Sequence, residues 1–147
     1  KGYWNAPDLT AEAIINGYYR TGDLAQVDDE GYIYIVDRKK EMMICGGFNI
    51  YPAEIEQVLF AHPAIYEGAA VGVPDEDMGE AIKAVVVLKP GHSATAEEIM
   101  AFCAERLPGF KRPRSVDFTN DLPKNPNGKI VRRLVREPFW VGKERRV

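Results

Sequence analysis

The sequence has 147 residues, of which 46% are hydrophobic and 28% are charged, a balance typical of a globular domain with a buried core. The formal net charge of -3 gives no general basic surface, so we expect no nucleic-acid partner. No apolar run approaches the roughly 20 residues that cross a bilayer, and no secretory signal is present. We therefore expect no transmembrane segment and a cytoplasmic protein. Cysteines and histidines are few and scattered, which indicates neither a disulfide framework nor a metal site.

The first part of the chain predicts a short helix followed by a β-hairpin. Residues 8–16 favour a helix that ends at Asn16-Gly17. Residues 24–27 and 32–36 are predicted to form two strands, paired across a polar turn that contains glycine. A run of charged residues, 37–41, then interrupts the pattern and is a candidate domain boundary.

Beyond this boundary the pattern alternates between helices and strands. A helix is predicted after Pro52 and ends before Pro63. Thr95 and Glu98 match a capping box that opens a second helix. Short strands are predicted at residues 42–44, 69–73, 81–88 and 115–119. The sequence thus predicts an α+β fold: a small C-terminal domain with a short mixed sheet of about three strands flanked by helices, preceded by the hairpin segment.

Residues 123–129 carry turn-forming residues around one lysine, Lys129. Two prolines restrict their own backbone and Asn127-Gly128 favours a tight turn, which places the lysine at the tip of a loop. Taken alone, the pattern is also typical of a solvated surface turn.

The end of the chain is basic, with seven Lys or Arg and two Glu in residues 129–147. Such a stretch can contact phosphates or an acidic partner, or simply face water. Phe139 and Trp140 lie within it, and we expect them to dock on the domain surface, because large aromatic side chains are usually buried. Binding of a partner is the alternative.

Three further segments precede Lys129 in a fixed order. Residues 19–23 read Tyr-Arg-Thr-Gly-Asp, residues 37–40 read Asp-Arg-Lys-Lys, and residues 46–52 read Gly-Gly-Phe-Asn-Ile-Tyr-Pro. With these motifs, the chain up to about residue 136 resembles the C-terminal part of the AMP-forming acyl-CoA synthetases, within the superfamily of adenylate-forming enzymes. The resemblance implies an ATP-dependent acid-thiol ligase that forms an acyl-adenylate, releases pyrophosphate and then forms an acyl-CoA thioester.

The resemblance also implies a division of the chain into three parts. Residues 1–36 correspond to the end of a large N-terminal adenylation domain, residues 37–41 to a hinge that includes Lys40, and residues 42–147 to a mobile C-terminal domain. The chain opens without methionine, and we expect it to be a piece of a longer protein. Because the phosphate loop and the acid pocket of such enzymes lie upstream, we expect the piece alone to be inactive.

Three residues match the adenylation machinery of these enzymes. Lys129 matches the catalytic lysine, whose positive charge contacts the acyl carboxylate and the α-phosphate and stabilises the charge that develops there. Asp23 and Arg38 match the residues that bind the ribose of ATP or AMP. A lysine acetyltransferase is a possible partner, since acetylation of Lys129 would remove its charge.

Four residues match the channel that admits the pantetheine arm of coenzyme A: Gly46, Gly47, Phe48 and Asn49. The double glycine offers backbone without Cβ atoms, which a thin ligand can approach closely. The chain departs from many relatives at Ile44, where they carry a lysine that helps the second half-reaction.

The expected cofactors are ATP, coenzyme A and Mg²⁺, with the metal bound mainly by the N-terminal domain. The other expected partners are that domain and a carboxylic acid, either a medium- or long-chain fatty acid or an aryl acid. Two alternatives stay open: a peptide-synthetase-like adenylation domain that loads a carrier protein, and a non-catalytic interaction module. Retention of Asp23, Arg38, Gly47 and Lys129 together argues against the module. Glu54 and Glu56, in the helix after Pro52, are interpreted as structural.

Overall fold

The computed structural model describes residues 1–144 and divides the chain into two compact units, Lys1–Lys40 and Glu41–Val147. The last three residues of the basic stretch, 145–147, lie outside the described residues. Within residues 1–144, no helix combines the length and the apolar character that crossing a membrane requires.

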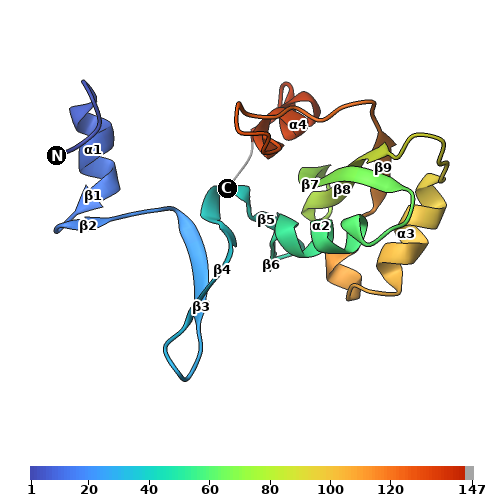
Figure 1. Ribbon diagram of the computed structural model, residues 1–147, viewed down its shortest axis with the longest axis horizontal. Helices are drawn as coiled ribbons and strands as arrows, with labels where there is room; N and C mark the ends of the chain where they lie inside the picture. The colour runs from blue at the N-terminus through green and yellow to red at the C-terminus, as the bar shows by residue number, and fades with distance from the viewer. Residues whose placement is uncertain (145–147) are drawn as a thin grey trace. The chain divides into compact units, whose positions relative to one another are not determined.

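The first unit consists of one helix and two small antiparallel hairpins (Figure 1). Its elements are α1 (Pro7–Ala13), β1 (Ile14–Ile15), β2 (Tyr18–Tyr19), β3 (Asp23–Val27) and β4 (Ile33–Arg38). The predicted helix over residues 8–16 was wrong at its end, because Asn16 and Gly17 form the turn between β1 and β2. Their φ angles of +51° and +81° are those of a tight hairpin turn, which a helix cannot contain.

The predicted pairing of the next two strands is confirmed. β3 and β4 run antiparallel, and their register places Asp23 opposite Arg38. The turn between them is held by Asp28, whose carboxylate accepts hydrogen bonds from the backbone N–H groups of Glu30 and Tyr32 at 3.0 and 2.9 Å. This hairpin therefore brings the two predicted ribose-binding residues side by side.

The second unit contains a five-stranded mixed sheet with helices packed against it (Figure 1). The strand order is β6-β5-β8-β7, and β9 pairs in parallel with β8, whereas the other pairs are antiparallel. The strands are β5 (Met43–Cys45), β6 (Phe48–Ile50), β7 (Ile65–Asp75), β8 (Gly79–Leu88) and β9 (Ser115–Phe118). The helices are α2 (Pro52–Phe60), α3 (Ala96–Ala104) and α4 (Arg132–Arg136), with 3-10 turns η2 (Gly109–Lys111) and η3 (Glu137–Trp140); a further 3-10 turn, η1 (Lys39–Glu41), includes the last two residues of the first unit and the first residue of the second.

The α+β class is confirmed, but the count of about three strands was wrong. The missed strand is β6, a three-residue segment between the double glycine and Pro52 that pairs with β5. Strand β7 is also longer than predicted, because it pairs with β8 along nearly its whole length. The capping box is confirmed: the Thr95 hydroxyl accepts the Glu98 N–H, and the Glu98 carboxylate accepts the Thr95 N–H.

Both faces of the long β7–β8 pair are covered. Alternate residues point to opposite faces, so Ala70 and Val86 join a core that contains residues of α2 and α3, whereas Ala69 and Val85 join a second cluster. Phe139 packs against this second cluster. The Trp140 indole N–H donates to the carbonyl of Gly72 at 2.9 Å, which confirms the predicted docking of the aromatic tail.

Candidate functional site

The loop that carries Lys129 is a closely hydrogen-bonded turn. The side-chain oxygen of Asn125 accepts the N–H groups of Asn127 and Lys129 at 3.0 and 2.9 Å. Gly128 has a φ of +77°, a left-handed conformation that glycine adopts without strain. Lys124 and Ile130 close the loop as an antiparallel bridge. The turn therefore fixes the backbone of Lys129 and leaves its side chain exposed.

Two lysines of this loop have opposite surroundings. The Lys124 ammonium lies 2.8 Å from a carboxylate oxygen of Asp121 and 2.8 Å from one of Glu67. The hydrogen bond to Asp121, together with that to Glu67, raises the pKa of Lys124 above its usual value. Across residues 1–144, the Lys129 ammonium forms neither an ion pair nor a hydrogen bond. Its charge is therefore free to meet an anionic ligand.

Lys129 borders an open hollow between α2, β7 and its own loop. Glu56 and Phe60 of α2, Tyr66 and Glu67 of β7, and the loop residues Gly128, Ile130 and Arg132 complete the lining. Glu56 is buried and bound to Arg132, so the Lys129 ammonium carries the exposed positive charge at this rim.

The first unit brings Asp23 and Arg38 together. Arg38 Nε lies 3.1 Å from Asp23 Oδ1, and both side chains retain exposed surface, 69% for Arg38 and 27% for Asp23. The residue before Asp23 and the residue after Arg38 are also hydrogen-bonded to each other, because the Lys39 N–H donates to the Gly22 carbonyl at 2.8 Å. Lys40 is exposed and is the last residue of this unit.

The double glycine forms the turn between β5 and β6. Gly46 and Gly47 have φ angles of +56° and +84°, which side chains disfavour. A Cβ atom on Gly46 would lie 2.7 Å from the sulfur of Met78, whereas a Cβ on Gly47 would meet open space. A side chain at position 46 would therefore have to displace that of Met78, whereas Gly47 presents bare backbone to the surroundings. Phe48 and Asn49 follow it, both exposed.

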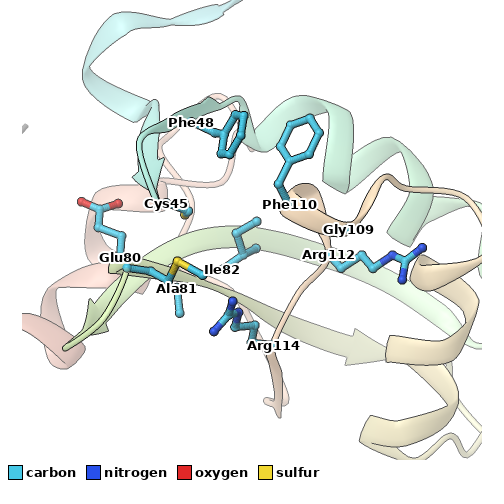
Figure 2. A pocket seen from close by; sticks show the side chains of 11 residues that line it. Cys45, Phe48, Glu80, Ala81, Ile82, Gly109, Phe110, Arg112 and Arg114 are labelled. Carbon is cyan, nitrogen blue, oxygen red and sulfur yellow. The ribbon is translucent and has the colours of Figure 1, made fainter.

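A second hollow lies beside this turn (Figure 2). The exposed rings of Phe48 and Phe110 stack at its rim with centroids 4.8 Å apart. Arg112 and Arg114, which follow Phe110, also line the hollow, as do Cys45 and Met78. An ion pair between Lys111 and Glu54 ties η2 to α2, so the interpretation of Glu54 as structural fits its contacts. Aromatic faces with nearby guanidinium groups suit a ligand that has a ring and phosphates.

The sequence interpretation overlooked Phe110, Arg112 and Arg114. An available signal was the alternation of an aromatic with basic residues in Phe-Lys-Arg-Pro-Arg, straight after Pro108-Gly109. The sequence interpretation also overlooked Arg132, whose partners Glu41 and Glu56 lie far away in the sequence.

The predicted residues of the second unit fall into two groups. Lys129 borders one hollow, and Gly46 and Phe48 border the other, and these two hollows share no lining residue.

Residues 1–144 contain no group of three or more His, Cys, Asp or Glu side chains arranged to hold a metal ion. His62 contacts protein instead: its Nδ1 accepts the Ala64 N–H at 3.2 Å and its ring meets Phe102 edge-on at 4.8 Å. Burial lowers the pKa of His62, which favours the neutral ring that this hydrogen bond requires.

Residues 54–129 match the AMP-binding enzyme C-terminal domain. The chain belongs to this family. A long-chain-fatty-acid–CoA ligase of Escherichia coli O6:H1 is 50% identical over 136 residues, which are 92% of this chain and 24% of that protein. A fatty acid–[acyl-carrier-protein] ligase, ScoC of Streptomyces coeruleorubidus, is 43% identical over 145 residues, which are 99% of this chain and 28% of that protein.

The family assignment extends to solved structures. ATP-bound MatB from Rhodopseudomonas palustris is 39% identical, with a TM-score of 0.86 over 95% of this chain and 28% of that chain. This family member therefore spans only about a quarter of the length of the relatives it matches.

Proposed function

We propose that this chain is the C-terminal part of an ATP-dependent acyl-CoA ligase. In the first half-reaction, such an enzyme joins a carboxylic acid to the α-phosphate of ATP and releases pyrophosphate. In the second, the thiol of coenzyme A displaces AMP and forms the thioester. The observation that carries the proposal is the exposed Lys129 ammonium, unpaired within residues 1–144 and held on a hydrogen-bonded turn, in a chain of the AMP-binding enzyme family.

Lys129 would serve the first half-reaction. Both reactants are anions, so a mobile cation that contacts the carboxylate and the α-phosphate lowers the repulsion between them and stabilises the transition state. The turn built on Asn125 supports this role, because it restricts the backbone and leaves only the side chain to be positioned. Acetylation of the exposed amine by a lysine acetyltransferase would remove the charge and stop adenylation.

Asp23 and Arg38 would bind the ribose of ATP and of the adenylate. A carboxylate accepts the two hydroxyl donors of a ribose, and an adjacent guanidinium holds the carboxylate in place. The 3.1 Å contact between Arg38 and Asp23 supports this pairing of roles. The site would be completed by the N-terminal domain, which would also hold most of the ligands of Mg²⁺; the metal would neutralise charge on the phosphates.

Coenzyme A would enter beside Gly46, Gly47, Phe48 and Asn49. The bare backbone of Gly47 leaves room for the narrow pantetheine arm. The stacked pair of Phe48 and Phe110 supports binding of the adenine ring, and the arginines beyond it suit the phosphates.

The two half-reactions would use the mobile domain in two arrangements, with residues 37–41 as the hinge. Lys129 and the glycine turn border separate hollows, which supports their taking turns at one reacting centre. Lys40→Pro tests the hinge in the full-length protein. A changed ratio of the two half-reactions is expected, and an unchanged ratio would leave Lys40 an ordinary surface charge.

The acid would be a medium- or long-chain fatty acid or an aryl acid, in line with the fatty-acid ligase among the relatives. A carrier protein is the alternative acceptor, and the similarity to the acyl-carrier-protein ligase favours keeping it in the test.

The test supplies the full-length protein with ATP, a panel of fatty and aryl acids, and either coenzyme A or a carrier protein that bears phosphopantetheine. Pyrophosphate release reports the first half-reaction and thioester formation reports the second. Acid-dependent pyrophosphate release followed by acyl-CoA formation supports the proposal. Thioester on the carrier alone would favour the alternative, and no acid-dependent release would contradict both.

A further inference from the structure

Arg132 lies three residues after Lys129 and joins two carboxylates from distant segments. Its Nε and Nη2 atoms donate to the two oxygens of Glu56 at 2.7 and 2.5 Å. Its Nη1 atom donates to Glu41 at 2.5 Å. The side chain of Arg132 is 22% exposed, so these contacts lie largely out of solvent.

The two acceptors lie in different parts of the second unit. Glu56 is buried in α2, and its Oε1 atom also accepts the backbone N–H of Ala70 in β7 at 3.1 Å. Glu41 is the first residue of the second unit and directly follows Lys40. Arg132 thus ties the chain just after the Lys129 turn to a core helix and to the start of its unit.

The chemistry of this contact requires arginine. A guanidinium offers several donors in one plane and can meet both oxygens of Glu56 while it reaches Glu41, whereas a lysine ammonium is a single point of charge. The hydrogen bond to Glu56 raises the pKa of Arg132, so the group stays charged. Glu56, Arg132 and Lys129 also line the same hollow.

We propose that Arg132 is a positioning residue for adenylation: by bridging Glu56 and Glu41, it fixes the Lys129 turn relative to α2 and to the last residue of the proposed hinge. The inference rests on the proposed function, in which the Lys129 ammonium meets the reacting groups. A misplacement of about 1 Å in such a site can lower a rate by about 100-fold. Thioester formation does not use Lys129 and is therefore independent of this bridge.

The test compares Arg132→Lys with Arg133→Lys in the full-length protein. Arg133 is the matched control, because it is exposed and pairs with Glu137 one helical turn away. Arg132→Lys is expected to lower kcat for pyrophosphate release by about 100-fold, with little change in KM for ATP and the acid. Thioester formation from supplied acyl-adenylate should keep its rate, and Arg133→Lys should match the wild type in both half-reactions.

Two results would overturn the inference: an equal loss in both half-reactions together with a lower Tm, or no loss in either. If Arg132→Lys does not fold, Glu41→Gln decides, since it leaves the contact of Arg132 with Glu56 in place and should slow adenylation selectively. Lys129→Ala in the same assay distinguishes a failure of the proposed function from a failure of the inference about Arg132. If Lys129→Ala adenylates normally, the proposed function fails; if it loses adenylation while the bridge variants behave as wild type, only this inference fails.

Discussion

The two hollows of the second unit differ in the chemistry that they present. The hollow beside Lys129 has an exposed ammonium at its rim, while the other charged residues of its lining are held in ion pairs, Glu56 with Arg132 and Glu67 with Lys124. The hollow beside Gly46 presents aromatic faces, with arginines further along. The first suits the stabilisation of charge on a reacting phosphorus, and the second suits the binding of an extended ligand with a ring. This difference supports the proposal that one small domain carries separate sites for the two half-reactions.

The hollows also differ in how they are built. The Lys129 turn is local, because Asn125 accepts hydrogen bonds from residues within four positions of itself. The other hollow is lined by the β5–β6 turn and by η2, two elements that lie far apart in the sequence. An ion pair between Glu54 and Lys111 helps to hold η2 in place. Variants can therefore be chosen that disturb one hollow and leave the other intact.

The largest expected effect comes from Lys129→Ala in the full-length protein. Removal of one group that stabilises a developing negative charge lowers a rate by about 100- to 1,000-fold, and we expect a loss of this size in adenylation. Acid-dependent pyrophosphate release measures it.

Lys124→Ala is the matched control for Lys129→Ala. Lys124 is in the same loop, but two carboxylates already neutralise it, so adenylation should stay close to wild type. An equal loss in both variants would mean that the loop needs positive charge in general and not the ammonium of Lys129.

Phe110→Ala should disturb the other hollow. Stacking of a base on an aromatic side chain contributes about 1–3 kcal/mol, so KM for coenzyme A should rise by about 5- to 150-fold. Adenylation, measured without coenzyme A, should be unchanged. An unchanged KM would place coenzyme A elsewhere.

Chemical modification of the Cys45 thiol tests the same hollow without a substitution, and the expected effect is smaller. It is half-buried at the second hollow, whereas Cys103 is fully buried, and that burial raises the pKa of the Cys103 thiol. A thiol reagent should therefore modify Cys45 first. A coenzyme A analogue without its thiol should slow this modification severalfold. Equal rates with and without the analogue would contradict the placement of coenzyme A at this hollow.

Trp140→Phe should have the smallest effect on catalysis. It removes the hydrogen bond to the Gly72 carbonyl, which should lower the free energy of unfolding by about 1 kcal/mol. Neither half-reaction should change at a temperature where the variant is folded. Thermal unfolding measures the loss, and a selective loss of one half-reaction would show that the tail belongs to a site.

Local patterns in the sequence predicted much of the second unit. Pro52, the Thr95 capping box and the apolar run of β8 act within a few residues, so their effects can be recognised without a structure. Asn16-Gly17 misled the prediction, because the same pair can end a helix or turn a hairpin, and the pairing of β1 with β2 decides between them.

Contacts between distant segments could not be predicted in this way. Strand β6 is too short to show a period, and it exists because β5 pairs with it. In the candidate site, the turn around Lys129 was predictable, since Asn, Pro and Gly shape it locally. The stacking of Phe48 on Phe110 and the contact of Arg132 with Glu56 depend on tertiary folding. Such contacts between distant residues cannot be predicted from spacing in the sequence.

The most direct test of the two-hollow account measures both half-reactions in Lys129→Ala and Phe110→Ala, side by side in the full-length protein. The account predicts a crossed pattern. Lys129→Ala should lose adenylation and still convert supplied acyl-adenylate to thioester, whereas Phe110→Ala should adenylate normally and require more coenzyme A. If each variant instead impaired both half-reactions to the same extent, the assignment of separate tasks to the two hollows would be wrong.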